Sequence, residues 1–372
     1  MKRLRVAVVG AGHLGRIHTR LIQSVDEVEL VGVADSVEEA RQRVAAEFHT
    51  AAFASHHELI GKIDAAIVAT PTKSHHAVGL ELLKAGVHVL IEKPITLTVP
   101  EADELVAAAA ARRLVLQVGH VERFNPALAA VEPHVSNPKF IEATRTSGYT
   151  FRSTDIGVVL DLMIHDLDVV LSLVRSEVID VQALGIAVFG PHEDMAHARL
   201  VFANGCVANL NASRTSFDSH RKMQIYAERA YAGVDFATGA AKIVRPNADV
   251  LARELDVHRL SPAEQMHVKE NLFRELLVLE EIQVEKRNAI LDEQHDFVIS
   301  IRSGGEPRVP GRQARDALLV AHRILDQIAA HRWSGTPQGP TGPHALPTPS
   351  VLRGPHWTHA TRESAIEKRK AG

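Results

Sequence analysis

Between residues 4 and 118, short apolar runs alternate with stretches long enough for helices, and this alternation constrains the fold more than any other feature. The runs are almost continuous in Val, Ile, Leu and Ala, as is typical of strands buried on both faces of a sheet. Alternating strands and helices favour a doubly wound parallel sheet with right-handed crossovers. We predict strands at 4–9, 30–34, 65–69, 87–91 and 115–118, and helices at 14–24, 37–48, 74–85 and 100–113.

Beyond about residue 121 the apolar runs lengthen and follow one another directly. Ala203-Asn204-Gly205 separates two of them and predicts a hairpin, because Asn-Gly readily adopts the positive φ angles of a tight turn. Consecutive hairpins indicate an α+β region with a mostly antiparallel sheet. We expect strands at 178–188, 196–202, 206–213, 223–228 and 233–237 and helices at 161–174, 292–302 and 313–331, whereas 272–286 fits both patterns.

A chain of 372 residues is long enough for two domains. We place the first at 1–120 and the second at 121–332. The remaining segment, 333–372, is rich in Pro and Gly and cannot bury enough apolar area to offset the cost of ordering it. We therefore expect a disordered tail.

The composition argues against several classes of function. There are 42 Lys and Arg residues against 45 Asp and Glu, with no long basic run, and only 4% of residues are aromatic, so a nucleic-acid partner is not expected. Cys206 is the only cysteine, which excludes an internal disulfide and a Cys-based metal site and suits the reducing cytoplasm. No stretch approaches the roughly 20 apolar residues of a membrane span. We expect a cytoplasmic protein.

Three glycines follow the first predicted strand at the spacing Gly-x-Gly-x-x-Gly. Gly10 would permit a tight turn, Gly12 would let the backbone approach a pyrophosphate, and Gly15 would allow close packing of helix on strand. His13 and Leu14 open the predicted helix, whose N-terminus would receive the phosphate charge. The alternative is a Gly-rich turn without a ligand.

Asp35 lies 20 residues after Gly15, at the end of the next predicted strand. A carboxylate there would accept a hydrogen bond from the ribose 2′-hydroxyl and repel a 2′-phosphate. Ser36 supplies no opposing positive charge. The predicted cofactor is therefore NAD rather than NADP.

Loops at the carboxyl ends of two further strands should line the ligand crevice. In the segment 69–75, Thr70 and Pro71 would flank the nicotinamide, with His75 close by; the alternative is an ordinary turn capped by Ser74.

Glu92-Lys93-Pro94 ends the next strand. Because Pro94 keeps Lys93 extended, its ammonium could project into the crevice and stabilise a developing alkoxide, with Glu92 positioning the lysine or contacting the cofactor. A surface salt bridge is the alternative.

A third group of polar residues lies on the predicted helix 161–174. Asp161, His165 and Asp168 fall at i, i+4 and i+7, on one helical face. A histidine beside a carboxylate is suited to remove an alcohol proton, so His165 is a candidate base that Asp161 would orient. The alternative is a solvated polar face. The other histidines include the pairs His56-His57 and His75-His76 but show no metal-ligand spacing, and no metal site is expected.

Together, the glycine motif, Glu92-Lys93-Pro94 and the Asp-x-x-x-His motif of Asp161 and His165 resemble the Gfo/Idh/MocA oxidoreductases. The resemblance covers about residues 4–331. It implies a Rossmann domain followed by an α/β domain with a large open sheet, a nicotinamide cofactor, and hydride exchange at a sugar or cyclitol carbon. It also implies that Lys93 and His165 contact the reacting hydroxyl, with Asp161 assisting.

A narrower resemblance concerns 118–126 and 155–166, which are similar to a branch of the family containing UDP-N-acetylglucosamine 3-dehydrogenases. This implies oxidation of the sugar 3-hydroxyl and makes Arg123, Asn125 and Arg152 candidates for substrate contact; arginine suits a diphosphate because it is permanently charged and bidentate. Many family members carry a Gly-rich stretch where this chain has Gly157-Val158-Val159-Leu160, which weakens the comparison with inositol and glucose enzymes.

The sequence therefore predicts an NAD-dependent dehydrogenase of a sugar, with a UDP-linked amino sugar favoured. Two alternatives stay open: oxidation or reduction of another sugar, cyclitol or ketone, and a non-catalytic NAD-binding regulator. Since an open sheet exposes a broad face, we also expect a homodimer or homotetramer.

Overall fold

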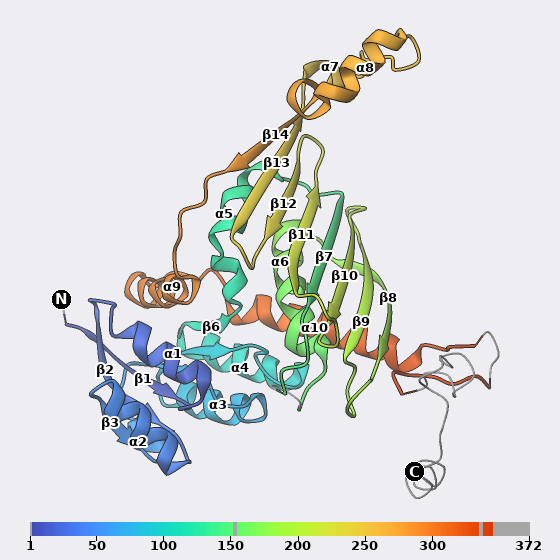
Figure 1. The fold of residues 1–372 in the computed structure, drawn as a ribbon. Coiled ribbons are helices and arrows are strands. Elements are labelled where there is room, and N and C mark those ends of the chain that lie inside the picture. The colour runs from blue at the N-terminus through green and yellow to red at the C-terminus, as the bar shows by residue number, and fades with distance from the viewer. Residues whose placement is uncertain (1, 152–154, 335–337, 345–372) are drawn as a thin grey trace, which may run out of the picture.

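The computed structural model describes residues 2–151, 155–334 and 338–344. The N-terminal part is a six-stranded sheet in the order β3-β2-β1-β4-β5-β6 with every pair parallel, which confirms the predicted doubly wound fold (Figure 1). The strands are β1 Leu4–Val9, β2 Val28–Ala34, β3 Ala51–Phe53, β4 Ala65–Val68, β5 His88–Glu92 and β6 Leu116–Gly119. β3 escaped prediction because it is a three-residue edge strand whose side chains are only partly buried.

Helices α1 His13–Ile22, α2 Glu38–Glu47, α3 His75–Lys84 and α4 Val99–Arg112 connect these strands, as predicted to within two residues. The start of α4 is fixed by a capping box in which Thr98 and Glu101 satisfy each other's backbone N–H groups. Two C-terminal helices return to this part of the molecule: α9 Ala289–Ser303 packs on α1, and α10 Gly311–Ala330 packs on α4.

The second sheet has eight strands in the order β14-β13-β12-β11-β7-β10-β9-β8. Among the described strands, β7 and β10 pair in parallel and the other neighbours antiparallel, so the mostly antiparallel prediction is confirmed. Asn204 and Gly205 do form the β9–β10 hairpin, with Gly205 at φ +81°. The strands are β7 Phe140–Thr146, β8 Val178–Ile186, β9 Met195–Phe202, β10 Val207–Ser213, β11 His220–Tyr226, β12 Tyr231–Asp235, β13 Ala240–Pro246 and β14 Leu277–Ile282.

β7 and β13 were not predicted, and the ambiguous segment 272–286 divides into a π-helical turn at Leu272–Leu276 and β14.

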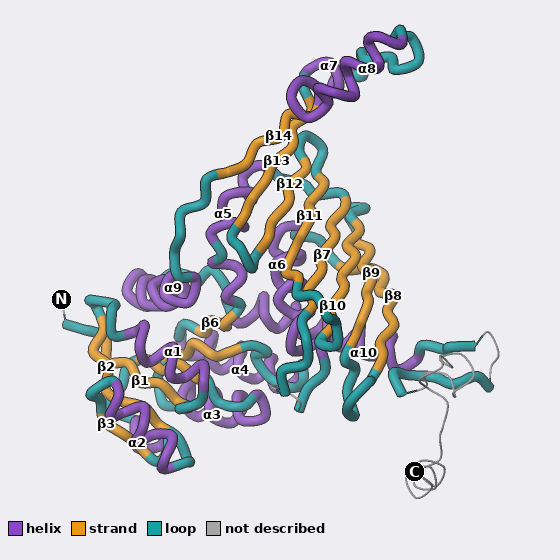
Figure 2. Tube along the Cα trace, viewed as in Figure 1, coloured by secondary structure: helices purple, strands orange, loops and turns teal. Residues whose placement is uncertain are grey.

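Helices α5 Pro126–Val131, α6 Ile164–Val174 and α10 cover one face of this sheet (Figure 2). The opposite face carries polar side chains such as Glu142, Asn209 and Lys222. β13 and β14 continue into an arm that carries α7 Ala248–Ala252 and α8 Pro262–Asn271 and protrudes from the body (Figure 1). In the described part of the chain, no helix combines the length and apolarity of a membrane span.

Of the segment predicted to be a tail, 333–334 and 338–344 are described. Trp333 Nε1 donates to the Gly342 carbonyl at 3.0 Å, and a histidine nitrogen of His344 contacts the Pro191 carbonyl at 2.8 Å. The rest of the predicted tail lies outside the described residues.

Candidate active site

The glycine turn joins β1 to α1 and has the geometry of a phosphate cradle. Gly10 has φ +109°, and a Cβ atom on it would lie 2.5 Å from the Ala69 carbonyl oxygen. A Cβ on Gly15 would lie 1.8 Å from the Gly10 carbonyl oxygen, so helix and turn touch directly. Around Gly12, by contrast, no described atom beyond Gly12 and its neighbours along the chain lies within 4 Å of where a Cβ would stand. The backbone is tightly packed at Gly10 and Gly15, whereas free space remains beside Gly12 at the N-terminus of α1. This space is where a dinucleotide pyrophosphate would bind.

Asp35 follows β2 and lies beside this turn. Its Oδ2 accepts a hydrogen bond from the Ala11 N–H at 2.7 Å, and its Oδ1 accepts one from the Val37 N–H at 2.8 Å. Each carboxylate oxygen retains a lone pair for a ribose hydroxyl. Arg41 donates to the Asp35 and Ser36 carbonyls, so a guanidinium that sequence reasoning overlooked lies at the same edge.

His75 joins the two loops expected to flank the nicotinamide. Its buried ring lies between the Pro94 carbonyl, 2.8 Å from Nδ1, and the Thr70 carbonyl, 2.8 Å from Nε2. Burial lowers the pKa of His75, against the opposing effect of these carbonyls. In the structure His75 thus connects the loop after β4, which includes Pro71, to the loop after β5.

Lys93 contacts Asp161 from the loop after β5. Its Nζ donates to Asp161 Oδ1 at 2.9 Å and to the Asp161 carbonyl at 2.8 Å. The Lys93–Pro94 peptide bond is cis. Two residues 68 positions apart in the sequence are thereby brought into one pocket.

A buried network that sequence analysis did not predict supports Glu92. Gln294 Nε2 donates to His18 Nδ1 at 2.9 Å, which leaves His18 Nε2 to carry the proton it shares with Glu92 Oε1 at 2.7 Å. The other oxygen, Oε2, accepts the Lys93 N–H at 3.2 Å. Burial raises the pKa of Glu92, but the His18 hydrogen bond and the Lys93 charge outweigh it, so the net pKa is lowered. Glu92 is therefore an ionised support for the lysine loop.

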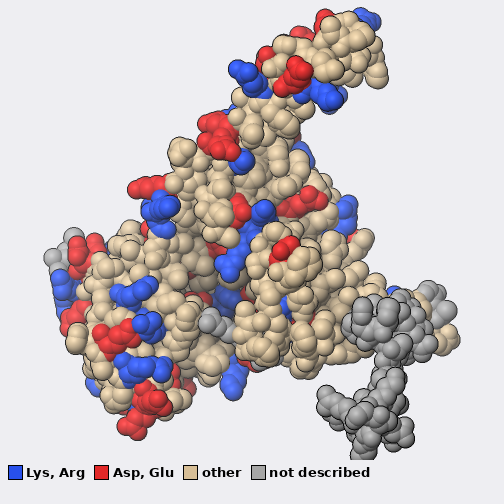
Figure 3. All heavy atoms as spheres, in the orientation of Figure 1, with Lys and Arg blue, Asp and Glu red and all other residues tan. Residues whose placement is uncertain are grey.

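His165 shares a pocket of 160 Å³ with Lys93 and Asp161, and Arg145 and Arg221 supply further positive charge to its wall. Figure 3 shows basic side chains gathered where the molecular surface is hollowed between the two parts of the molecule. The pKa of His165 lies well below its usual value, because burial disfavours the charged ring and Lys93 and Arg145 repel it. A ring held neutral can accept a proton.

The helix before His165 differs from the prediction. Residues Val159–Met163 form a π-helical turn, and α6 begins only at Ile164. The wider turn breaks the i, i+4 stacking on which the expected pairing of Asp161 with His165 depended. Asp161 is bonded to Lys93 instead, and His165 Nδ1 has no hydrogen-bond partner among the described residues. Asp168 lies apart from this pocket, 3.5 Å from Arg123.

Arg145 of β7 anchors a buried ionic network next to the pocket. Its Nε and Nη2 donate to the two oxygens of Asp166 at 2.9 and 2.8 Å, and its Nη1 donates to Glu122 at 2.8 Å. The two acids raise the pKa of Arg145 in spite of its burial. Sequence reasoning missed this group because β7 itself was not predicted, although Glu122 and Asp166 lie inside segments already singled out.

The candidates for substrate contact are placed elsewhere or lie outside the described residues. Arg123 donates to Gln313 and to the Arg308 carbonyl, away from the pocket of Lys93 and His165. Asn125 caps α5 by accepting the Ala127 N–H at 3.0 Å. Arg152 is among the residues that the structure does not describe.

Comparisons with known proteins agree with this architecture. Residues 4–120 match the model of the oxidoreductase family with an NAD-binding Rossmann fold, and residues 127–232 match the GFO/IDH/MocA C-terminal domain. UDP-N-acetylglucosamine 3-dehydrogenase of Acidithiobacillus ferrooxidans is 42% identical over 331 residues, covering 89% of this chain and 99% of that protein. A solved structure of that enzyme superposes with a TM-score of 0.77 at 35% identity, covering 88% of this chain and 98% of the other. Myo-inositol 2-dehydrogenase of Thermotoga maritima is 26% identical over 359 residues, covering 88% and 97%.

Proposed function

The chain belongs to the Gfo/Idh/MocA family of NAD-dependent oxidoreductases, and on that premise we propose that it oxidises the 3-hydroxyl of a UDP-linked N-acetylamino sugar such as UDP-N-acetylglucosamine. The observation that carries the proposal is the meeting of Lys93, Asp161 and His165 in one pocket beside the glycine-turn domain. The match of almost the whole chain to a dehydrogenase of this substrate supports the choice of sugar.

The chain's own residues supply the proton chemistry. His165 Nδ1 is buried, which leaves Nε2 as the nitrogen that takes the hydroxyl proton. The Lys93 ammonium, held by Asp161, stabilises the oxyanion that develops as this proton leaves. Gly10, Gly12, Gly15 and Asp35 would hold NAD, which supplies the hydride acceptor when bound.

A panel assay tests the proposal. Purified protein is mixed with NAD and, separately, UDP-N-acetylglucosamine, other UDP-sugars, glucose and inositols, and NADH absorbance is followed. We expect turnover on UDP-N-acetylglucosamine above all others. If no UDP-sugar were oxidised but an inositol were, the proposed substrate would be wrong, whereas the oxidoreductase activity of the family would still hold.

Arg152, which lies outside the described residues, stays a prediction for contact with the substrate diphosphate, because a guanidinium binds phosphate oxygens in pairs. Arg152→Ala should raise KM for the UDP-sugar at least tenfold with little change in kcat. An equal KM in the variant would contradict this role.

We also propose that the chain assembles into a homodimer or homotetramer through the outer face of the second sheet, because α5, α6 and α10 all pack on the opposite face and leave this one open in the described part of the chain. The single cysteine of the chain suits the cytoplasm. Light scattering coupled to size-exclusion chromatography measures the assembly directly. A monomeric mass at micromolar concentration would rule it out.

A further inference from the structure

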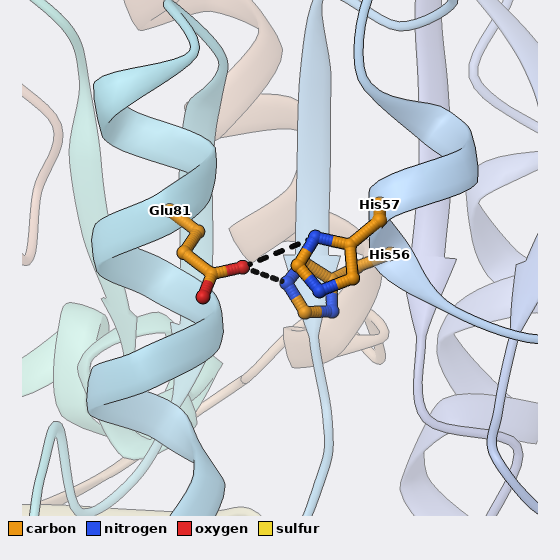
Figure 4. A group of neighbouring side chains, drawn as sticks. All are labelled: His56, His57 and Glu81. Carbon is orange, nitrogen blue, oxygen red and sulfur yellow. Dashed lines mark hydrogen bonds and ion pairs between the residues drawn. The ribbon is translucent and has the colours of Figure 1, made fainter.

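Two histidines and a glutamate converge in the first domain, outside the pocket of Lys93 and His165. His56 and His57 lie on the 3-10 turn His56–Leu59 that follows β3, and Glu81 lies on α3. Both rings approach the same carboxylate oxygen (Figure 4): His56 Nε2 is 2.7 Å and His57 Nδ1 3.2 Å from Glu81 Oε2. The two ring centroids are 4.2 Å apart. Three atoms able to bind a metal thus lie within 4.8 Å of one another.

We propose that His56, His57 and Glu81 form a binding site for a divalent transition metal ion, with Zn²⁺ the best match. Two imidazole nitrogens and one carboxylate oxygen are a ligand set that Zn²⁺ uses when its fourth position is open to water. Bonds of about 2.0–2.1 Å place tetrahedral ligands roughly 3.3 Å apart. The His57 Nδ1–Glu81 Oε2 distance of 3.2 Å is close to that value, and the His56 Nε2–Glu81 Oε2 distance of 2.7 Å would lengthen when an ion enters. Imidazole ligands disfavour Mg²⁺ and Ca²⁺, which prefer oxygen.

The exposure of the three side chains allows an ion to enter. His56 is mostly buried, with 14% of its side chain exposed, whereas His57 and Glu81 are 63% and 47% exposed. An ion bound here would cross-link the β3–β4 connection to α3 and raise the melting temperature in a saturable way.

Titration of the full-length protein with ZnCl₂, followed by calorimetry, tests the site. His57→Ala and Glu81→Ala each remove one ligand, and His76→Ala is the matched control because His76 pairs with Glu104 at 3.0 Å in the same domain. Wild type and control should bind Zn²⁺ with equal affinity, and both ligand variants at least tenfold more weakly. Co²⁺ should give an intense tetrahedral absorption band that the ligand variants lose. Zn²⁺ affinity unchanged in both ligand variants, or no binding to the wild type, would overturn the proposal.

A separate group of buried polar atoms without hydrogen-bond partners in the described part of the chain lies near His165. His120 follows β6, is 1% exposed, and its ring stands edge-on to that of His165 with centroids 6.2 Å apart. Among the described residues, neither His120 nitrogen has a hydrogen-bond partner, and Asp168 Oδ2 has none either.

We infer that His120 is a positioning residue for His165; this rests on the proposed function. When His165 takes the hydroxyl proton, its buried Nδ1–H needs an acceptor, and Asp161 is already bonded to Lys93. His120 offers nitrogens that have no partner among the described residues, on a ring that stands edge-on to that of His165, with the centroids 6.2 Å apart.

His120→Phe keeps a ring without an acceptor, and His120→Asn keeps an acceptor. We expect His120→Phe to lower kcat at least tenfold with KM and NAD affinity unchanged, and His120→Asn to restore most of the loss. Full kcat in His120→Phe would refute the role of His120 alone. Absence of turnover by the wild type on every sugar would instead refute the proposed function, and the role of His120 with it.

Discussion

Replacing Arg145 by methionine isolates the energetics of the ionic network beside the pocket. Arg145 is 4% exposed, and its guanidinium donates to both Asp166 oxygens and to Glu122, which are themselves buried. Methionine fills much of the volume but leaves two buried carboxylates without their cation. Breaking a buried ion pair from one side costs about 3–5 kcal/mol, so we expect the free energy of unfolding to fall by that amount.

Urea unfolding measures this loss, with Arg16→Met as the control because the Arg16–Glu47 pair lies at the surface and should contribute little to stability. The deficit of Arg145→Met should shrink at about pH 5, since a carboxyl stripped of its cation in a buried site favours the protonated form. The reasoning would be refuted if Arg145→Met lost no more unfolding free energy than the control. It would also be refuted if that loss did not change with pH, because Arg145 would then not be neutralising the two buried carboxylates.

Four further outcomes are expected. Lys93→Met and His165→Asn should each lower kcat by about 10²–10⁴-fold while fluorescence titration shows NAD affinity nearly unchanged, and full turnover in either would remove its assigned role. Because burial and the neighbouring cations lower the pKa of His165 well below 6.5, the base stays unprotonated as pH falls through that value; kcat/KM for oxidation should remain flat there and decline only at lower pH, and a midpoint at 6.5 would be inconsistent with the pocket. Gly12→Ala should weaken NAD binding without loss of stability, since its Cβ meets open space, whereas Gly15→Ala should also destabilise the fold, a contrast that calorimetry and thermal unfolding can measure. Burial raises the pKa of Cys206 to about 11, so a disulfide reagent at about pH 8 should leave the folded protein unmodified and label one thiol in urea.

Local pattern was sufficient for much of the architecture. The buried parallel strands read as continuous apolar runs, and the Asn204-Gly205 turn and the glycines after β1 were identifiable because their backbone angles or close contacts require those residues. β3 was missed because it is short and lies at an edge. β7 was missed although it is central, because Glu142, Thr144 and the buried Arg145 interrupt its apolar run.

The sequence by itself thus determined the fold class, the family and the residue types available for catalysis, since these depend on periodicity and on short motifs. Only the tertiary structure decided which polar groups meet. Because of the π-helical turn, Asp161 is hydrogen-bonded to Lys93 rather than to His165. The position of α9 places Gln294 against His18, and the packing of α3 places Glu81 against His56. The partners of a polar side chain depend on how helices and strands pack against one another. Contacts between residues tens or hundreds of positions apart leave no periodic signal along the chain.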